Sequence, residues 1–201
     1  MTGVYLALEG VEGSGKTTVA STIVARLSSG GIEAVQTREP GGTTLGEHIR
    51  RLLLHTDDMS PWAEVALFAA QRAQLADEVL GPALSRGAWV VSDRSYYSSL
   101  AYQGSARGLG VEVVRTINRI ALDGVEPDVV AVLDIDPAVG LARQLDADRI
   151  GGSGLAFQEK VADAYRHLAA AEPERVFLIP AGGSPDEVAD RVLAVTERAV
   201  V

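Results

Sequence analysis

Short apolar runs alternate with longer amphipathic stretches along most of the chain. Five of the short runs are typical of strands, because they are four or five residues long and rich in Val, Leu and Ile. They cover residues 4–8, 34–37, 89–93, 129–133 and 176–179. Near-continuous apolar strands are expected where both faces of a sheet are covered, so the pattern predicts a parallel sheet.

The stretches between these runs predict helices. Their expected bounds are residues 17–27, 43–54, 60–85, 112–122 and 155–170, with further helices opening at Pro137 and Pro185. Ser60, Asp136 and Ser184 each precede a proline, which is typical of a helix N-cap followed by its first residue. Right-handed crossovers between parallel strands then predict a doubly wound α/β fold, with a five-stranded parallel sheet and helices on both faces. We expect residues 1–201 to form a single domain.

The first expected strand and helix are joined by a glycine-rich loop, residues 10–17. It reads Gly-Val-Glu-Gly-Ser-Gly-Lys-Thr and fits the pattern G-x-x-x-x-G-K-S/T without mismatch. Glycines let successive N–H groups point at an anion, and the helix N-terminus adds partial positive charge. Lys16 would then reach the β- and γ-phosphates, and the Thr17 hydroxyl would face Mg²⁺. The predicted nucleotide-binding residues are Gly10, Val11, Glu12, Gly13, Ser14, Gly15, Lys16, Thr17 and Thr18.

Composition narrows the class of partner. The formal net charge of −9 argues against a broad nucleic-acid or anionic-membrane surface, so an anionic substrate must be held by local arginines. The absence of cysteine excludes disulfides, thiolate catalysis and cysteine zinc sites, and fits a cytoplasmic chain. The sequence shows neither a signal peptide nor an apolar run long enough to span a membrane.

Further candidate chemistry follows the other strands. Ligands of parallel sheets bind beyond the carboxyl ends of the strands. Arg38 follows the second strand, Asp93 and Arg94 end or follow the third, and Asp134 and Asp136 follow the fourth. Two arginines beside a phosphate loop predict a site for two phosphorylated ligands. Asp93 and Asp134 are candidate acids near Mg²⁺, whereas Asp136 is favoured as a helix cap.

One polar, glycine-rich stretch interrupts the alternation of strands and helices. Residues 146–154 read Asp-Ala-Asp-Arg-Ile-Gly-Gly-Ser-Gly. In a nucleotide enzyme such a stretch between two helices is a candidate lid, which we place at about residues 143–154.

The motifs together resemble the thymidylate kinase family of bacterial type, within the P-loop nucleoside monophosphate kinases. The likeness lies in residues 8–18, in residues 37–43 with Glu47 and Arg50, and in the pair Phe68 and Arg72. It continues through residues 93–104, which include Ala-Tyr-Gln-Gly, and through residues 148–149 and 157–158. It therefore runs from about residue 4 to residue 170.

This resemblance implies transfer of a phosphoryl group from ATP to dTMP, giving ADP and dTDP for dTTP synthesis. It implies ATP and Mg²⁺ as cofactors, no nucleic-acid or membrane partner, and a cytoplasmic homodimer. Another nucleoside monophosphate kinase, acting on dCMP, UMP or a modified deoxynucleotide, is the alternative enzyme. An inactive nucleotide-binding module is the alternative from another class.

The resemblance also implies roles for individual side chains. Arg94 and Arg50 hold the dTMP phosphate, Arg72 and Phe68 address the thymine, and Tyr102 disfavours a ribose. The implied substrate-binding residues are Glu12, Arg38, Arg50, Phe68, Arg72, Arg94, Ser98, Ser99, Tyr102 and Gln158. The implied catalytic residues are Lys16, Arg94, Arg149, Arg143, Glu12 and Asp93, and the metal-binding residues are Thr17, Glu12 and Asp93. Whether Glu12 faces the sugar 3′-hydroxyl or the metal stays open.

The chain departs from the family's pattern where transition-state charge is stabilised. In one subgroup a basic residue lies within the phosphate loop, but residues 11–14 carry none here. The charge is then expected from the lid, as in the other subgroup, although this lid keeps only Arg143 and Arg149. Ser95 and Gly151 also replace residues that are usual in the family.

Overall fold

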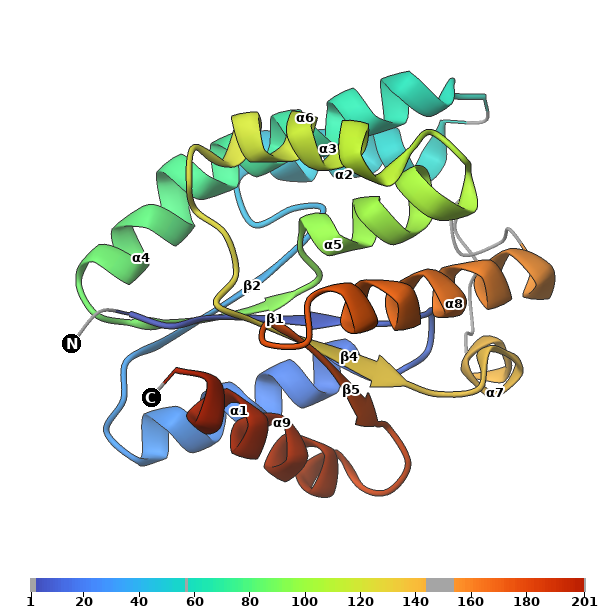
Figure 1. Cartoon of the computed structure of the whole chain (residues 1–201). Helices are drawn as coiled ribbons and strands as arrows, with labels where there is room; N and C mark the ends of the chain where they lie inside the picture. The colour runs from blue at the N-terminus through green and yellow to red at the C-terminus, as the bar shows by residue number, and fades with distance from the viewer. Residues whose placement is uncertain (1–2, 57, 144–153, 201) are drawn as a thin grey trace.

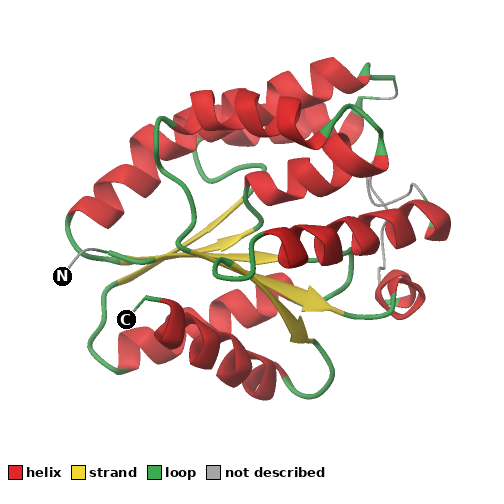
Figure 2. Cartoon of the chain, in the orientation of Figure 1, coloured by secondary structure: helices red, strands yellow, loops and turns green. Residues whose placement is uncertain are grey.

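The computed structural model of the protein, which describes residues 3–56, 58–143 and 154–200, contains one five-stranded sheet in which every pair of neighbours is parallel. The strand order is β2-β3-β1-β4-β5. The strands are β1 (Tyr5–Glu9), β2 (Ala34–Arg38), β3 (Trp89–Asp93), β4 (Val129–Asp134) and β5 (Val176–Pro180). All five predicted strands are confirmed to within a residue or two, and so is the doubly wound α/β class (Figures 1 and 2).

Helices cover both faces of the sheet. On one face lie α1 (Lys16–Ser29) and α9 (Pro185–Ala199), in the lower part of Figure 1. The other face carries α2 (Thr44–His55), α3 (Pro61–Leu75), α4 (Gly81–Ser85), α5 (Tyr96–Ser99), α6 (Val111–Leu122) and α8 (Leu155–Ala171). The short α7 (Pro137–Ala142) follows β4 at the carboxyl end of the sheet. Both termini lie at the opposite, amino end (Figure 1).

The central strand β1 explains why its sequence shows no alternation of polar and apolar residues. All five of its residues are buried. Tyr5 and Ala7 belong to the core beneath α3, α5 and α8, whereas Leu6 and Leu8 belong to the core shared with α1 and α9. Because both faces are covered, an apolar residue is favoured at nearly every position.

Helix starts follow the expected capping chemistry. The Ser60 side chain accepts the N–H of Ala63 at the start of α3, and the Asp136 side chain accepts an N–H at the start of α7. Ser184 opens α9 with a capping box. These contacts satisfy N–H groups that the first helical turn leaves unpaired.

Two π-helical turns modify the predicted helices. The helix expected over residues 60–85 is α3 and α4 joined by the π-helical η1 (Ala76–Leu80). Residues 96–106, for which the sequence pattern predicted no helix, form α5 and the π-helical η2 (Leu100–Ala106). Residues 96–104 are all buried, so this segment has no polar stripe, and a π-turn breaks the 3.6-residue period.

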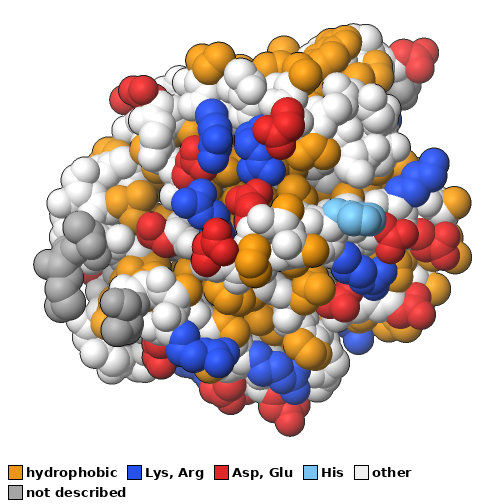
Figure 3. Space-filling model, viewed as in Figure 1, with side chains coloured by type: hydrophobic (Ala, Val, Ile, Leu, Met, Phe, Trp, Pro, Cys, Tyr) orange, Lys and Arg blue, Asp and Glu red, His pale blue; other side chains and the backbone are white. Residues whose placement is uncertain are grey.

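The surface carries both signs of charge. Figure 3 shows acidic and basic side chains interspersed over the face in view, rather than one broad basic area. Within residues 3–56, 58–143 and 154–200, no helix combines the length and hydropathy that a membrane span requires.

Candidate active site

The phosphate loop lies at the carboxyl end of β1, where three of its glycines adopt positive φ. Gly10, Gly13 and Gly15 have φ of +136°, +70° and +93°. A Cβ on Gly13 would lie 2.0 Å from the carbonyl oxygen of Gly140 in α7, whereas a Cβ on Gly15 would meet nothing within 4 Å. Glycine is therefore required at position 13 by packing as well as by conformation.

Lys16 turns back over the loop that precedes it. Its Nζ donates to the carbonyl oxygens of Val11 (2.9 Å) and Gly10 (3.2 Å) and to Ser14 Oγ (3.2 Å). Burial, followed by the nearby positive charge of Arg94, lowers the pKa of Lys16 to about 8. The ammonium is thus held at the centre of the loop by weak neutral acceptors, which anionic phosphate oxygens would outcompete.

Acidic side chains near the loop are divided among three tasks. Asp93, at the end of β3, accepts a hydrogen bond from the Thr17 hydroxyl. Asp134 forms an ion pair with Arg166 at 3.2 Å, and Asp136 caps α7 as predicted. Asp93 is therefore the acid that lies beside the loop hydroxyl.

A Mg²⁺ ion fits the oxygen donors found there. Thr17 and Asp93 supply a hydroxyl and a carboxylate, and Mg²⁺ prefers oxygen ligands and commonly takes one or two protein groups together with substrate phosphates and water. Among the described residues, no group of three or more His, Cys, Asp and Glu could hold a metal by itself. The protein donors thus suit a metal that arrives with the nucleotide.

Arg94 occupies an unusual backbone conformation directly after β3. Its φ is +76°, a region that costs a non-glycine residue roughly 1–3 kcal/mol. Its guanidinium forms an ion pair with Glu12 (2.5 Å) and donates to Ser98 Oγ (3.1 Å). It also lies 5.3 Å from the ring centroid of Tyr102. This backbone twist places a cation between the phosphate loop and η2.

Glu12 faces that cation from inside the phosphate loop. Burial opposes ionisation of the carboxyl, but Arg94 and then Lys16 outweigh it and lower the pKa of Glu12. The Tyr102 hydroxyl donates to the same carboxylate at 3.4 Å. Glu12 is thus an anion at neutral pH, and it connects the loop to the neighbouring pocket.

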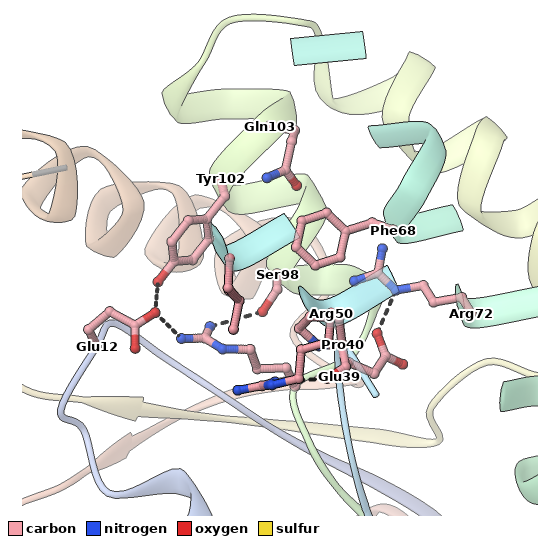
Figure 4. Close-up of a pocket in the computed structure, with 11 residues that line it drawn as sticks. Glu12, Glu39, Pro40, Arg50, Phe68, Arg72, Ser98, Tyr102 and Gln103 are labelled. Carbon is pink, nitrogen blue, oxygen red and sulfur yellow. Dashed lines mark hydrogen bonds and ion pairs between the residues drawn. The ribbon is translucent and has the colours of Figure 1, made fainter. Parts of the chain in front are cut away.

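That pocket is a cleft between the loop, α2, α3 and η2 (Figure 4). Cationic groups line it near the loop, and an aromatic ring and polar side chains line its other end (Figure 4). The lining residues are Glu12, Glu39, Pro40, Arg50, Leu54, Phe68, Arg72, Arg94, Ser98, Tyr102 and Gln103. Seven of the ten predicted substrate-binding residues, Glu12 among them, therefore line one cleft.

Arg72 forms the floor of the cleft and is fully buried. Its Nε pairs with Glu39 (2.5 Å), and its Nη1 donates to Ser99 Oγ and to Asn118 Oδ1, both at 2.7 Å. Its guanidinium carbon lies 5.2 Å from the ring centroid of Phe68. Ser99 does not line the cleft, because its hydroxyl faces Arg72 instead.

The remaining predicted residues lie in different places. Arg50 donates to the carbonyl oxygen of Pro40 (2.8 Å) and lines the cleft, whereas Arg38 pairs with Glu47 (3.1 Å) in a second hollow, which Thr17 and Asp93 also line. Gln158 is fully buried outside both hollows, and its side-chain amide has no hydrogen-bond partner among the described residues.

The structure describes only the two ends of the predicted lid, Arg143 and Gly154. Arg143 is exposed at the end of α7. Arg149 and most of the predicted lid lie outside the described residues.

Four lining residues were absent from the predicted site: Glu39, Pro40, Leu54 and Gln103. Gln103 donates to Glu64 Oε1 at 2.6 Å, and its own carbonyl oxygen is buried without a partner in the described structure. A buried unpaired acceptor is costly, so a ligand donor would be favoured there. Its place beside Tyr102 in the segment Ala-Tyr-Gln-Gly was the available signal.

A phosphate loop beside an arginine-lined cleft, at the carboxyl end of this parallel sheet, defines a nucleotide-binding protein of the P-loop kinase type. Comparison with known proteins narrows the class. The family model described as Thymidylate kinase matches residues 8–192. The chain therefore belongs to the thymidylate kinase family.

Individual relatives cover almost the whole chain. A thymidylate kinase of Synechococcus sp. (strain JA-3-3Ab) is 47% identical over 96% of this chain and 95% of its own length. A thymidylate kinase of Deinococcus radiodurans is 42% identical, with 98% of both chains covered. The crystal structure of thymidylate kinase from Ehrlichia chaffeensis superimposes with a TM-score of 0.82 at 28% identity, covering 97% of this chain and 99% of that one.

Proposed function

We propose that this protein transfers the γ-phosphoryl group of ATP to dTMP, giving ADP and dTDP. The observation that carries the proposal is the Glu12–Arg94 ion pair, because it joins a nucleotide-binding loop to a cleft with cationic and aromatic walls. A donor nucleotide on the loop and a monophosphate in the cleft would meet at Arg94. The family membership supports the same reaction.

On the donor side, the loop amides and Lys16 would hold the ATP phosphates. Thr17 and Asp93 would hold Mg²⁺, which supplies charge neutralisation at the β- and γ-phosphates when it is bound. The present contacts of Lys16 with loop carbonyls support this role, since its ammonium lies within the curve of the loop, close to where a phosphate would bind. Glu12 would face either the acceptor's 3′-hydroxyl or the metal.

On the acceptor side, Arg94 and Arg50 would hold the dTMP phosphate. Phe68 would stack on the thymine, and Arg72, fixed by Glu39, would donate to a base carbonyl. The unpaired carbonyl oxygen of Gln103 would accept the base N–H. Tyr102, Ser98 and Ser99 would define the sugar side, with Ser99 acting through Arg72.

Catalysis would consist of positioning and charge stabilisation, as in phosphoryl transfer generally. The phosphate loop lacks a basic residue at positions 11–14. We therefore assign the transition-state cation to the lid, with Arg149 ahead of Arg143. Arg38 would act near the phosphates, whereas the burial of Gln158 outside both hollows gives no support to its predicted role at the base.

A coupled assay of ADP release tests the reaction. The protein is given ATP and Mg²⁺ with dTMP, dUMP, dCMP, CMP or UMP in turn, and kcat/KM is compared. We expect dTMP to be the best substrate by about tenfold or more over dUMP, since a buried methyl contact contributes roughly 1–2 kcal/mol. A higher kcat/KM for dUMP or for a cytidine monophosphate would contradict the proposal that dTMP is the preferred substrate. ATP binding with no ADP release on any acceptor would indicate an inactive module.

We further propose that the protein is a cytoplasmic homodimer, associating through α2, α3 and α6. Of the ten large hydrophobic side chains exposed in the described structure, five lie on these helices, which supports them as the contact: Leu45, Leu52, Trp62, Val113 and Ile120. Sedimentation equilibrium should give about twice the 21.1 kDa chain mass. Ile120→Glu should shift the protein towards the monomer, and a monomeric wild type would contradict the proposal.

A further inference from the structure

Glu9 is a buried carboxylate to which the roles above assign no task. It ends β1 immediately before the phosphate loop and is fully buried. Its Oε1 accepts the N–H groups of Ser95 (2.7 Å) and Ser98 (3.1 Å) and the Ser95 hydroxyl (2.8 Å). Its Oε2 accepts the hydroxyls of Ser98 and Tyr165, both at 2.6 Å. Five donors therefore converge on one carboxylate. Four of them belong to Ser95 and Ser98, which follow Arg94 closely in the chain.

The first route from Glu9 to Arg94 runs through the main chain. The positive φ of Arg94 is unfavourable for a residue with a side chain, so its neighbours must hold it. The Arg94 N–H donates to Leu8 O at 2.9 Å, and the next N–H, that of Ser95, donates to Glu9. Consecutive residues of β1 thus fix the peptide groups on both sides of the strained residue.

The second route runs through the Ser98 hydroxyl. Its single proton is donated to Glu9 Oε2, so its lone pairs are free to accept from Arg94 Nη1 at 3.1 Å. Glu9 therefore holds the Ser98 hydroxyl with its lone pairs towards the guanidinium. The carboxylate reaches Arg94 at both its backbone and its side chain without touching the cleft.

We propose that Glu9 is a positioning residue, which holds Arg94 in the geometry that receives the acceptor phosphate. This inference rests on the role proposed for Arg94. It differs from a role in folding alone because it depends on where the carboxylate oxygens lie. The proposed role also differs from a simple effect of charge, because the reach of the Glu9 side chain, more than its negative charge, should determine kcat/KM for dTMP.

Two conservative variants separate these possibilities. Glu9→Gln keeps the reach of the side chain. Its side-chain carbonyl oxygen can accept the N–H groups of Ser95 and Ser98, and its NH₂ can donate to the hydroxyls of Ser98 and Tyr165. The second lone pair of Ser98 Oγ then stays available to Arg94. Glu9→Asp keeps the charge but withdraws the oxygens by about one bond length, ~1.5 Å. We expect kcat/KM for dTMP within about fivefold of wild type in Glu9→Gln. In Glu9→Asp we expect a loss of roughly 10²-fold, mostly as a raised KM for dTMP, with the KM for ATP nearly unchanged.

Matched controls measure the purely structural effect. Tyr165→Phe removes one donor to Glu9 and a contact of the Ser98 hydroxyl at 3.2 Å, but the hydrogen bonds that make the two routes to Arg94 remain. Asp128→Ala removes a carboxylate that accepts the N–H of Tyr5 at the other end of the same strand (2.8 Å). Both should lower the melting temperature and leave the KM for dTMP unchanged.

Each outcome has a defined meaning. Wild-type kinetics in folded Glu9→Asp, or a greater loss in Glu9→Gln than in Glu9→Asp, would overturn the proposal while Arg94→Ala remains impaired. An unchanged KM for dTMP in Arg94→Ala would instead overturn the role of Arg94, and this inference with it. The order wild type, Gln, Asp in kcat/KM would support both.

Discussion

The donor and acceptor halves of this site are built by different means. The phosphate loop is a continuous segment, and its groups are mainly main-chain N–H groups and one lysine. The acceptor cleft draws its side chains from the loop after β2, from α2, α3 and η2, and from the end of β3. The first half is local in sequence, and the second exists only after the chain has folded.

Their electrostatics differ in the same way. Lys16 donates to neutral carbonyl and hydroxyl oxygens, and the carboxylates of Glu12, Asp93 and Glu9 offset only part of the cost of burying its charge. In the cleft, Arg72 and Arg94 are already paired with Glu39 and Glu12. Removing one member of a buried pair leaves the other unpaired, which commonly costs about 3–5 kcal/mol. We therefore expect the acceptor half to be rigid and the donor half to depend on its ligand.

Arg94→Ala should have the largest effect on catalysis. Arg94 would hold and orient the acceptor phosphate, so kcat/KM for dTMP should fall by about 10³-fold without it. Binding of ATP, which we assign to the other half, should change by less than about threefold. The coupled assay gives the first value and calorimetry the second. Arg26→Ala, which removes an arginine from a surface ion pair, is the control; an equal loss of ATP binding in Arg94→Ala would contradict the division into halves.

The lid arginine should separate chemistry from binding. Arg149→Ala should lower kcat by about 10²-fold and leave dTMP affinity nearly intact, because the guanidinium would act only in the transition state. Single-turnover kinetics and equilibrium binding of dTMP measure the two quantities. Arg143→Ala is the matched comparison, and an unchanged kcat in Arg149→Ala would transfer the role to Arg143.

Two glycine variants test whether the phosphate loop requires glycine because of packing against α7 or because of its backbone conformation. A Cβ on Gly13 would lie 2.0 Å from Gly140 O, so Gly13→Ala should lower the free energy of unfolding by roughly 2–3 kcal/mol. Gly15→Ala has free space but keeps an unfavourable φ of +93°, and should cost only about 1 kcal/mol. Urea denaturation of the ligand-free protein measures both. Equal losses would mean that backbone strain, rather than contact with α7, sets the requirement for glycine.

The same contrast explains which parts of the molecule could be predicted from the sequence. The five strands, the caps at Ser60 and Asp136 and the phosphate loop are local patterns, and the structure agrees with each. The sequence pattern predicts no helix over residues 96–106 because residues 96–104 are all buried and a π-turn breaks the amphipathic period. Glu39 lies within the motif of residues 37–43, but no local pattern predicts its ion pair with Arg72, which is 33 positions away in the chain. The resemblance implies Ser99 as a substrate-binding residue, but only the fold turns its hydroxyl towards Arg72.

The last effect we predict is a pH dependence of ATP binding through Lys16. The pKa of Lys16 is lowered from 10.5 to about 8 in the ligand-free protein, first by burial and then by Arg94. Phosphates would restore the proton, so ATP affinity should be greatest below pH 8 and fall by up to about tenfold per pH unit above it. The unfolded chain binds more protons between pH 8 and 10.5, so in that window the same group should make the free energy of unfolding rise with pH. Calorimetry in buffers of different ionisation enthalpy should show proton uptake on ATP binding near pH 8. Lys16→Arg should show none, and a pH-independent affinity in the wild type would mean that Lys16 keeps its proton throughout.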